Sequence, residues 1–108
     1  MKVKALVIDP FREEIYETLV GQDNIQEYQK IVGGYIEAAG RYDNLDVLFV
    51  NEEGLFKDNQ KFFSLKELTS QPLAGVGFMV GHDEEGCSQD VKITQLDLAM
   101  KVEWVQPV

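Results

Sequence analysis

The sequence predicts a two-layer α+β domain, in which a mostly antiparallel sheet of about five strands carries two helices packed on one face. Short runs of β-branched and apolar residues, separated by turn residues, predict the strands. Two other stretches combine helical apolar periodicity with helix-capping residues. The chain has 108 residues, which is enough for one hydrophobic core and too few for two. We therefore expect residues 1–108 to form a single domain.

The first strand is predicted at residues 3–8. The run Val-Lys-Ala-Leu-Val-Ile is largely apolar, as expected for a central strand buried on much of both faces, and Pro10 ends its ladder. Residues 11–20 fit either an amphipathic helix or a charged edge strand. We favour the edge strand, because Gly21 and the start of another helix follow directly.

A helix is predicted at residues 24–32. Asp23, with Gln26 three residues later, has the form of a capping box. Lys30 falls in the last turn, where the helix dipole favours a cation, and Gly33 is placed as the left-handed residue that ends the helix. The apolar residues that share one face are Ile25, Tyr28, Ile31 and Val32.

A hairpin is predicted next, with strands at residues 35–39 and 46–51 joined by a turn at residues 43–44. Three aromatic residues beyond it are expected at the edge of the core: Phe56, Phe62 and Phe63. The spacing of Ser64 and Glu67 permits one short helical turn.

Residues 73–81 predict a strand interrupted by glycines. Gly75 and Gly77 remove side chains from the same face, so a neighbouring group must approach that face closely. A helix or an aromatic ring is favoured as that neighbour, and a ligand is the alternative. The next residues, 82–86, form an acidic loop.

The second helix is predicted to begin at Gln95, with Thr94 as its cap and Pro107 as its stop. Leu96, Ala99 and Met100 are expected on one side of this helix. Residues 90–93 before it fit either a strand or the opening of a helix. Six residues are expected in the core: Val7, Ile36, Leu48, Phe49, Phe78 and Trp104.

Charge and cysteine content limit the classes of function. The formal net charge is −9, from 19 acidic and 10 basic residues, so the surface disfavours binding to a nucleic acid backbone. Cys87 is the only cysteine, which excludes an internal disulfide and favours the reducing cytoplasm. No leader pattern opens the sequence, and no apolar run approaches the ~20 residues that span a membrane. We expect a soluble cytoplasmic protein with no membrane partner.

The sequence predicts no enzyme, no metal and no cofactor. His82, Asp83, Glu84 and Cys87 crowd one loop, but such closely spaced side chains rarely converge on one ion. Glu37 and Glu52 would form a carboxylate pair only if they faced each other across the hairpin, and a solvated sheet surface is the favoured alternative. Residues 43–46 lack the glycine and distal glutamate of a calcium loop.

One group of motifs resembles a known family. Residues 31–37 read Ile-Val-Gly-Gly-Tyr-Ile-Glu, and residues 51–54 read Asn-Glu-Glu-Gly. The matching positions are Ile31 to Glu37, Val50 to Gly54, Asn59 and Ala74 to Gly81. They resemble a small domain-of-unknown-function family carried mainly by bacteriophages, plasmids and other mobile elements, although residues 83–94 depart from its pattern. The resemblance implies an accessory protein of a mobile element in a bacterial host cell, and it implies no catalytic residue.

Three hypotheses for function follow. In the first, a non-catalytic accessory protein binds a host protein through its acidic surface, as a counter-defence protein would, with DNA mimicry as the extreme form. In the second, the protein binds or sequesters a small nucleotide-like signal. The residues proposed for that ligand are Gly33, Gly34, Tyr35, Arg41, Asn51 and Asn59. In the third, a structural module forms a homo-oligomer through an exposed strand edge such as residues 13–17.

Overall fold

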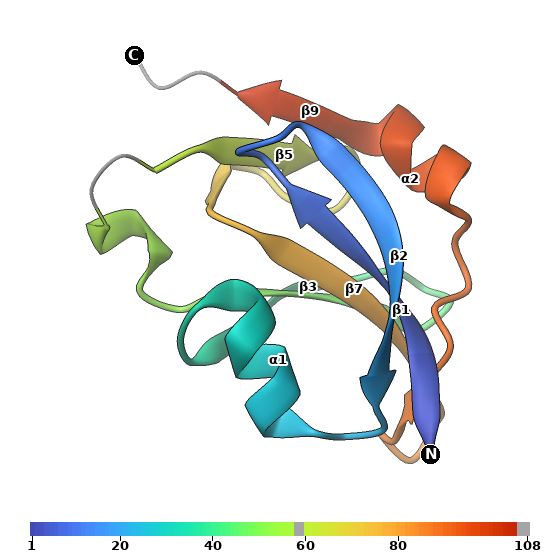
Figure 1. Cartoon of the computed structure of the whole chain (residues 1–108). Coiled ribbons are helices and arrows are strands. Elements are labelled where there is room, and N and C mark those ends of the chain that lie inside the picture. Colours follow the sequence, from blue (N-terminus) through green and yellow to red (C-terminus); the bar gives the residue numbers. More distant parts are fainter. Residues whose placement is uncertain (58–59, 106–108) are drawn as a thin grey trace.

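The computed structural model describes residues 1–57 and 60–105, which form two antiparallel sheets, two α-helices and one short 3-10 helix (Figure 1). The expected mixture of helices and mostly antiparallel strands is confirmed. The elements in chain order are β1 (Lys2–Asp9), β2 (Glu14–Gly21), α1 (Ile25–Val32), β3 (Ile36–Arg41), β4 (Asp46–Asn51), η1 (Gly54–Phe56), β5 (Phe62–Leu65), β6 (Leu73–Ala74), β7 (Gly77–His82), β8 (Ser88–Gln89), α2 (Gln95–Lys101) and β9 (Val102–Val105).

The larger sheet has the strand order β2-β1-β7-β4-β3, and β8 pairs with the end of β7. β1 lies between β2 and β7, so the prediction of a buried central strand is confirmed. β2 lies at one edge of this sheet, so the edge strand favoured for residues 11–20 is confirmed from Glu14 onward, whereas residues 11–13 form a turn. β3 and β4 form the predicted hairpin, with a register shift between Ala38 and Gly40.

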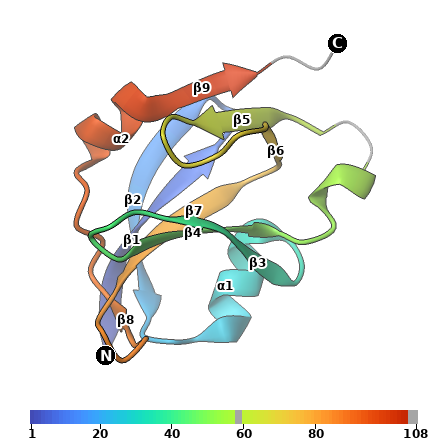
Figure 2. The ribbon, with the colours of Figure 1, turned by 180° about the vertical axis from the view of Figure 1, so that it is seen from behind.

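A second sheet of three strands, with the order β6-β5-β9, was not predicted (Figure 2). The expected strand at residues 73–81 is divided between the two sheets, because Gly75 has φ 85° and turns the chain between β6 and β7. The expected helix beyond Lys101 was wrong, since residues 102–105 pair with β5 as β9. Where the spacing of Ser64 and Glu67 permitted a short helical turn, the structure has a hydrogen-bonded turn after β5, in which the Thr69 N–H donates to the Leu65 carbonyl at 3.0 Å.

The core is divided between the two faces of the larger sheet. On one face, α1 contributes Tyr28 and Val32 to a cluster with the odd-numbered apolar residues of β1. On the other face, α2 and the smaller sheet contribute Leu98, Phe63 and Leu65 to a cluster with the even-numbered residues of β1. Since successive side chains of a strand point to opposite faces, the two helices lie on opposite sides of the larger sheet. The prediction that both helices share one face was therefore wrong.

Both helices begin with a side-chain cap. Thr94 caps α2 as predicted, with its hydroxyl accepting from the Asp97 N–H at 3.1 Å. The α1 cap is Asn24, whose side chain accepts from the Glu27 N–H at 3.2 Å, so the prediction of Asp23 was wrong by one residue. Asp23 instead has φ 55° and turns its carboxylate away from the helix to Ser88.

Gly33 ends α1 in the left-handed conformation, with φ 80° and ψ 27°, as predicted. Replacing Gly33 by alanine is expected to lower the free energy of unfolding by about 1 kcal/mol, because a Cβ disfavours this conformation. Gly33→Asn should cost less, because asparagine tolerates it better. Urea denaturation of the three proteins measures the difference, and equal midpoints for wild type and Gly33→Ala would contradict the assignment.

Packing against an aromatic ring explains why residue 77 is a glycine. A Cβ on Gly77 would lie 2.9 Å from the Phe63 ring, so the favoured close neighbour, an aromatic ring, is confirmed at this position. Of the six residues expected in the core, Val7, Leu48 and Phe78 are buried, whereas Ile36, Phe49 and Trp104 are partly buried against it. Phe56 is 85% exposed, so its expected place at the core edge was wrong.

A buried carboxylate fixes the segment that leads into α2. Asp46 is fully buried at the start of β4. Its two oxygens accept from the backbone N–H groups of Lys92 and Ile93, each at 2.9 Å. The Asn44 amide donates a third hydrogen bond at 3.0 Å. Residues 90–93, expected as strand or helix, are therefore an irregular segment held by a side chain.

No helix in the part of the chain that the structure describes has the length and apolar character needed to cross a membrane.

Candidate functional site

The glycine corner, defined as Gly33, Gly34, Tyr35 and Asn51, is where the small-ligand hypothesis placed its site. The structure brings these four residues together at the end of α1. The Asn51 amide donates to the Val32 carbonyl at 3.3 Å, and its oxygen accepts from the Glu53 N–H at 2.8 Å. A Cβ on Gly34 would lie 2.7 Å from that amide. The polar atoms of Asn51 are thus engaged in joining α1 to the turn after β4.

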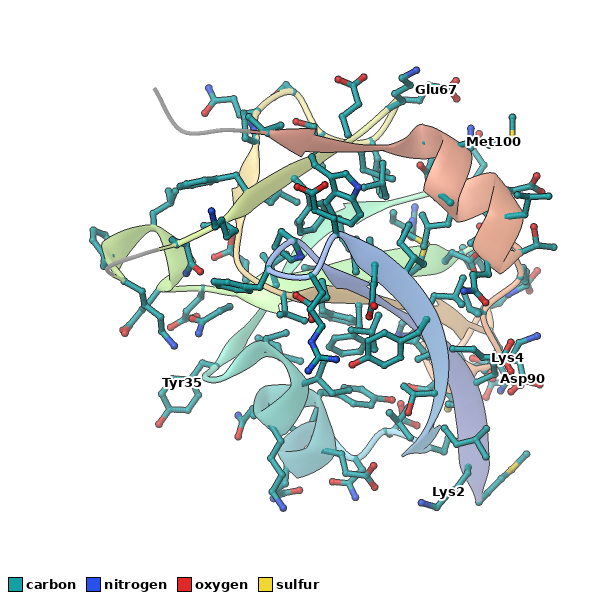
Figure 3. The ribbon with its side chains drawn as sticks, turned by 45° about the horizontal axis from the view of Figure 1, so that its top comes forward. Lys2, Lys4, Tyr35, Glu67, Asp90 and Met100 are labelled. Carbon is teal, nitrogen blue, oxygen red and sulfur yellow. The ribbon has the colours of Figure 1, made fainter. Side chains whose placement is uncertain are left out.

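The other residues proposed for that ligand do not complete the site. Arg41 lies at the far end of β3, roughly 20 Å from Tyr35 at the strand rise of an extended chain. Asn59 lies outside the described residues. The cation at the corner is Lys57, whose Nζ donates to the Gly33 carbonyl at 3.0 Å. Tyr35 is 67% exposed and points away from the body of the protein (Figure 3).

The void beside the corner is small. It measures about 90 Å³ and is bordered by Asn51, Leu73 and the exposed Glu37 and Glu52. Pockets for small ligands typically measure roughly 300–1,000 Å³. The glycine corner therefore holds α1 against the turn after β4 and leaves too little space for a small ligand.

In the acidic loop after β7, the Asp83 side chain stabilises the turn. Asp83 accepts from the backbone N–H groups of Glu85 and Cys87, both at 2.9 Å, which closes the turn between β7 and β8. Within residues 1–57 and 60–105, no three His, Cys, Asp or Glu side chains lie close enough to hold a metal ion.

A polar network joins the same hairpin to α1. The Ser88 hydroxyl and backbone N–H both donate to Asp23, at 2.7 and 2.9 Å. The Tyr28 hydroxyl is 2.7 Å from the Ser88 oxygen, and Ser88 is fully buried. These hydrogen bonds, first from the Ser88 side chain and then from its backbone, lower the pKa of the Asp23 carboxyl below its ordinary value.

This network predicts a pH-dependent contribution to stability. Because the folded-state pKa of Asp23 is lowered, its contribution is present above the unfolded-state pKa, near 4, and is lost as the pH falls through the folded-state pKa. Asp23→Asn should therefore unfold at a lower temperature than wild type at pH 7, by a margin that shrinks toward pH 2. Ser88→Ala, which removes the main donor, should show the same trend. A margin independent of pH would contradict it.

The outward side of α2 is apolar. Leu96 and Met100 are each 71% exposed, and Ala99 between them is also exposed. Figure 3 shows Met100 on the outer side of α2. The prediction that Leu96, Ala99 and Met100 share one side of the helix is confirmed, and that side faces solvent because the helix buries Leu98 instead. We call Leu96, Ala99 and Met100 the α2 face.

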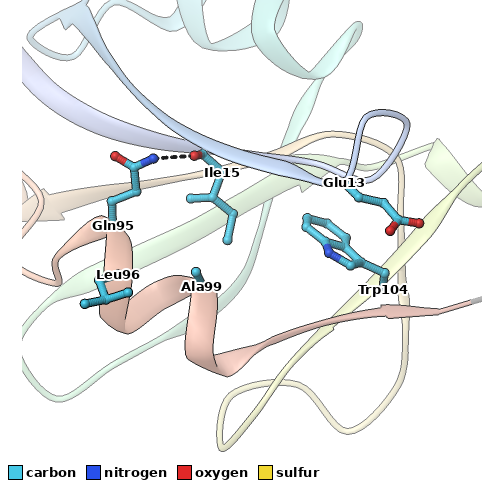
Figure 4. A pocket seen from close by; sticks show the side chains of 6 residues that line it. All are labelled: Glu13, Ile15, Gln95, Leu96, Ala99 and Trp104. Atoms are coloured by element: carbon cyan, nitrogen blue, oxygen red, sulfur yellow. Dashed lines mark hydrogen bonds between the residues drawn. The ribbon is translucent and has the colours of Figure 1, made fainter.

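Two grooves flank the α2 face. The first, of about 460 Å³, separates α2 from the edge of β2 and is called here the β2–α2 groove (Figure 4). Its lining residues are Glu13, Ile15, Gln95, Leu96, Ala99 and Trp104. The second, of about 480 Å³, is bordered by Met100, Ile93 and charged residues that include Lys66 and Asp97. The α2 face therefore lies between two grooves, one largely apolar and one lined by several charged residues.

These features define a small α+β protein with an exposed apolar side on α2 and, in its described residues, no cluster of metal ligands. A family model described as a domain of unknown function (DUF3846) matches residues 1–102, so the chain belongs to that family. No curated protein and no solved structure matches the chain.

Proposed function

We propose that this protein is a non-catalytic accessory protein of a phage or mobile element, which acts in the bacterial cytoplasm by binding a host protein through its α2 face. The exposure of Leu96 and Met100 on one side of a short helix carries the proposal. Fully burying a side chain of this size contributes roughly 1.5–3 kcal/mol, so a partner that covers both gains substantially. Exposed apolar patches with a polar rim are typical of protein-binding sites.

The charge of the chain supports a basic partner. The net charge of −9 favours association with a positively charged surface and speeds the encounter. Glu13 beside the α2 face, and Asp97 on α2 itself, place carboxylates at the rim of the apolar area, and Lys66 and Lys101 line the groove beside Met100. It is therefore the net charge of the whole chain that favours a basic partner. A host protein that normally binds nucleic acid has the complementary charge, which suits a counter-defence role.

The proposal is tested by co-purification from the bacterium that carries the gene. Tagged wild type is compared with Leu96→Ser/Met100→Ser and with Leu55→Ser/Phe56→Ser, which changes two equally exposed apolar residues on η1. We expect one protein to co-purify in a fixed ratio with wild type and with the η1 variant, and to be lost with the α2 variant. Equal recovery with all three proteins, or with none, would refute the role of the α2 face.

The nucleotide-like ligand has less support. The β2–α2 groove has the volume of a small-molecule site, but its one charged lining residue is Glu13, which would repel a phosphate. The void at the glycine corner is smaller than such a ligand requires. The homo-oligomer would use the edge of β2, and the chemistry of that edge favours a different occupant.

A further inference from the structure

The free edge of β2 follows from its pairing with β1. The two strands are antiparallel with an unbroken register, and the Gln22 N–H donates to the Met1 carbonyl at 3.0 Å. Hydrogen-bonded pairs alternate in such a ladder. The even-numbered residues of β2 therefore direct their N–H and C=O groups to β1, whereas Glu17 and Leu19 direct theirs away from the sheet.

The chain itself covers both ends of this edge. At one end the Gln95 amide donates to the Ile15 carbonyl at 2.6 Å (Figure 4). At the other end the Gly21 N–H donates to the Glu27 carboxylate at 3.2 Å. Between these caps, the outward backbone groups of Glu17 and Leu19 have no hydrogen-bond partner among the described residues. An unpaired stretch of edge is a template for an added strand.

The side chains around the open stretch combine apolar surface with negative charge. Leu19 is 60% exposed, and the edge leads past Ile15 into the apolar β2–α2 groove. Glu14 and Glu17 are exposed on the strand. The Lys4 ammonium is 3.9 Å from Glu17 and both side chains are about half exposed, so this pair neutralises Glu17 only weakly.

We propose that the open edge at Glu17 and Leu19 is a strand-addition site for an extended segment of the partner protein, in which apolar and basic residues alternate. Because Glu14 and Glu17 point to opposite faces of the sheet, the basic residues of the segment match Glu17, on the face that also holds Ile15 and Leu19. The continuing chain fills the β2–α2 groove. A second copy of this protein is disfavoured, because it would bring another net charge of −9 to the same edge. This inference rests on the proposed function and specifies how the partner binds.

The test uses a capped eight-residue peptide that alternates valine and lysine, added to isotope-labelled protein, with amide hydrogen exchange followed by NMR. We expect the Glu17 and Leu19 amides to gain protection from exchange, while the already paired Tyr16 and Thr18 amides change little. A peptide with glutamate in place of lysine should give no protection. Absence of protection at millimolar lysine peptide, or protection confined to residues away from β2, would overturn the proposal. Protection that grows with protein concentration alone would assign the edge to a second copy and also overturn it.

Two variants of Leu19 separate the contribution of its backbone N–H from that of its side chain. Leu19→Pro removes an outward N–H and leaves the ladder to β1 intact, because proline is tolerated where the N–H of an edge strand faces solvent. Leu19→Ala removes the side chain and keeps that N–H. We expect Leu19→Pro to weaken peptide binding about tenfold relative to Leu19→Ala, as loss of a backbone hydrogen bond and steric blocking of the edge imply. Equal affinities would contradict strand addition.

The two proposals fail in different ways. A host protein that co-purifies with Leu19→Pro but is lost with the α2 variant would keep the proposed function and refute strand addition. A host protein retained by the α2 variant would refute the α2 face itself.

Discussion

Replacing Asp46 by alanine is expected to lower the free energy of unfolding by roughly 3 kcal/mol, because three part-buried hydrogen bonds are lost and each contributes about 0.5–1.5 kcal/mol. The carboxylate is fully buried and receives three hydrogen bonds. Two of its donors, the backbone N–H groups of Lys92 and Ile93, have no other acceptor in the described residues. Their segment should detach and loosen α2.

Urea denaturation monitored by circular dichroism measures the effect, with Asp43→Ala as the matched control. Asp43 is an exposed aspartate in the same turn, so its removal should change stability by no more than about 0.5 kcal/mol. Asp46→Asn should also be destabilised, because its amide NH₂ would replace an oxygen that accepts from a backbone N–H or from Asn44. An Asp46→Ala protein that unfolds at the wild-type urea concentration would show that the hydrogen bonds of Asp46 to residues 92–93 do not stabilise the fold.

Replacing Phe63 by alanine is expected to cost about 3–5 kcal/mol, the range for deleting a large buried aromatic side chain. Phe63 is fully buried, and it lies on β5 opposite Trp104 of β9. Its ring reaches the larger sheet beside Gly77, so it joins the two sheets. Alanine would leave a cavity between the two sheets and weaken the packing of the smaller sheet against the larger one.

Phe56→Ala is the control for this prediction, because Phe56 is largely exposed. Its stability should stay within about 0.5 kcal/mol of wild type. The urea midpoints of Phe63→Ala and Phe56→Ala, each compared with wild type, measure the two losses of stability. Equal losses would show that Phe63 does not join the sheets.

Local sequence was sufficient where an element depends on its own residues. The apolar runs at residues 3–8 and 46–51 predicted β1 and β4, and Gly33 predicted the end of α1. The α1 cap was misplaced by one residue because Asp23 and Asn24 are both good caps. Ser88, which decides between them, is 65 residues away in the chain.

Elements that depend on distant partners were missed. β5 and β9 are four-residue strands that exist because they pair with each other, and neither carries a long alternating pattern. The apolar residues of β9 were assigned to the preceding helix, since no glycine or proline follows Lys101 directly. Pairing across such a sequence separation has no local signal.

The candidate site shows the same limit. Periodicity identified Leu96, Ala99 and Met100 as one side of α2, but it could not tell whether that side packs inward. The rotation of α2 about its axis is set by the hydrogen bonds from Asp46 to the preceding segment and by the burial of Leu98. Neither follows from the residues of α2 alone. The glycine corner was located correctly as a turn, whereas a ligand role there stays a prediction.

The most direct test of the proposed mode of action is native mass spectrometry of the tagged protein, purified gently from the cells that naturally carry its gene. We expect the mass of one chain together with one other polypeptide, and the mass of one chain alone for Leu96→Ser/Met100→Ser. A single chain that carries only the added mass of a small metabolite would contradict the proposal and favour sequestration of a ligand. A complex made only of copies of this chain would contradict it as well, and would favour self-association.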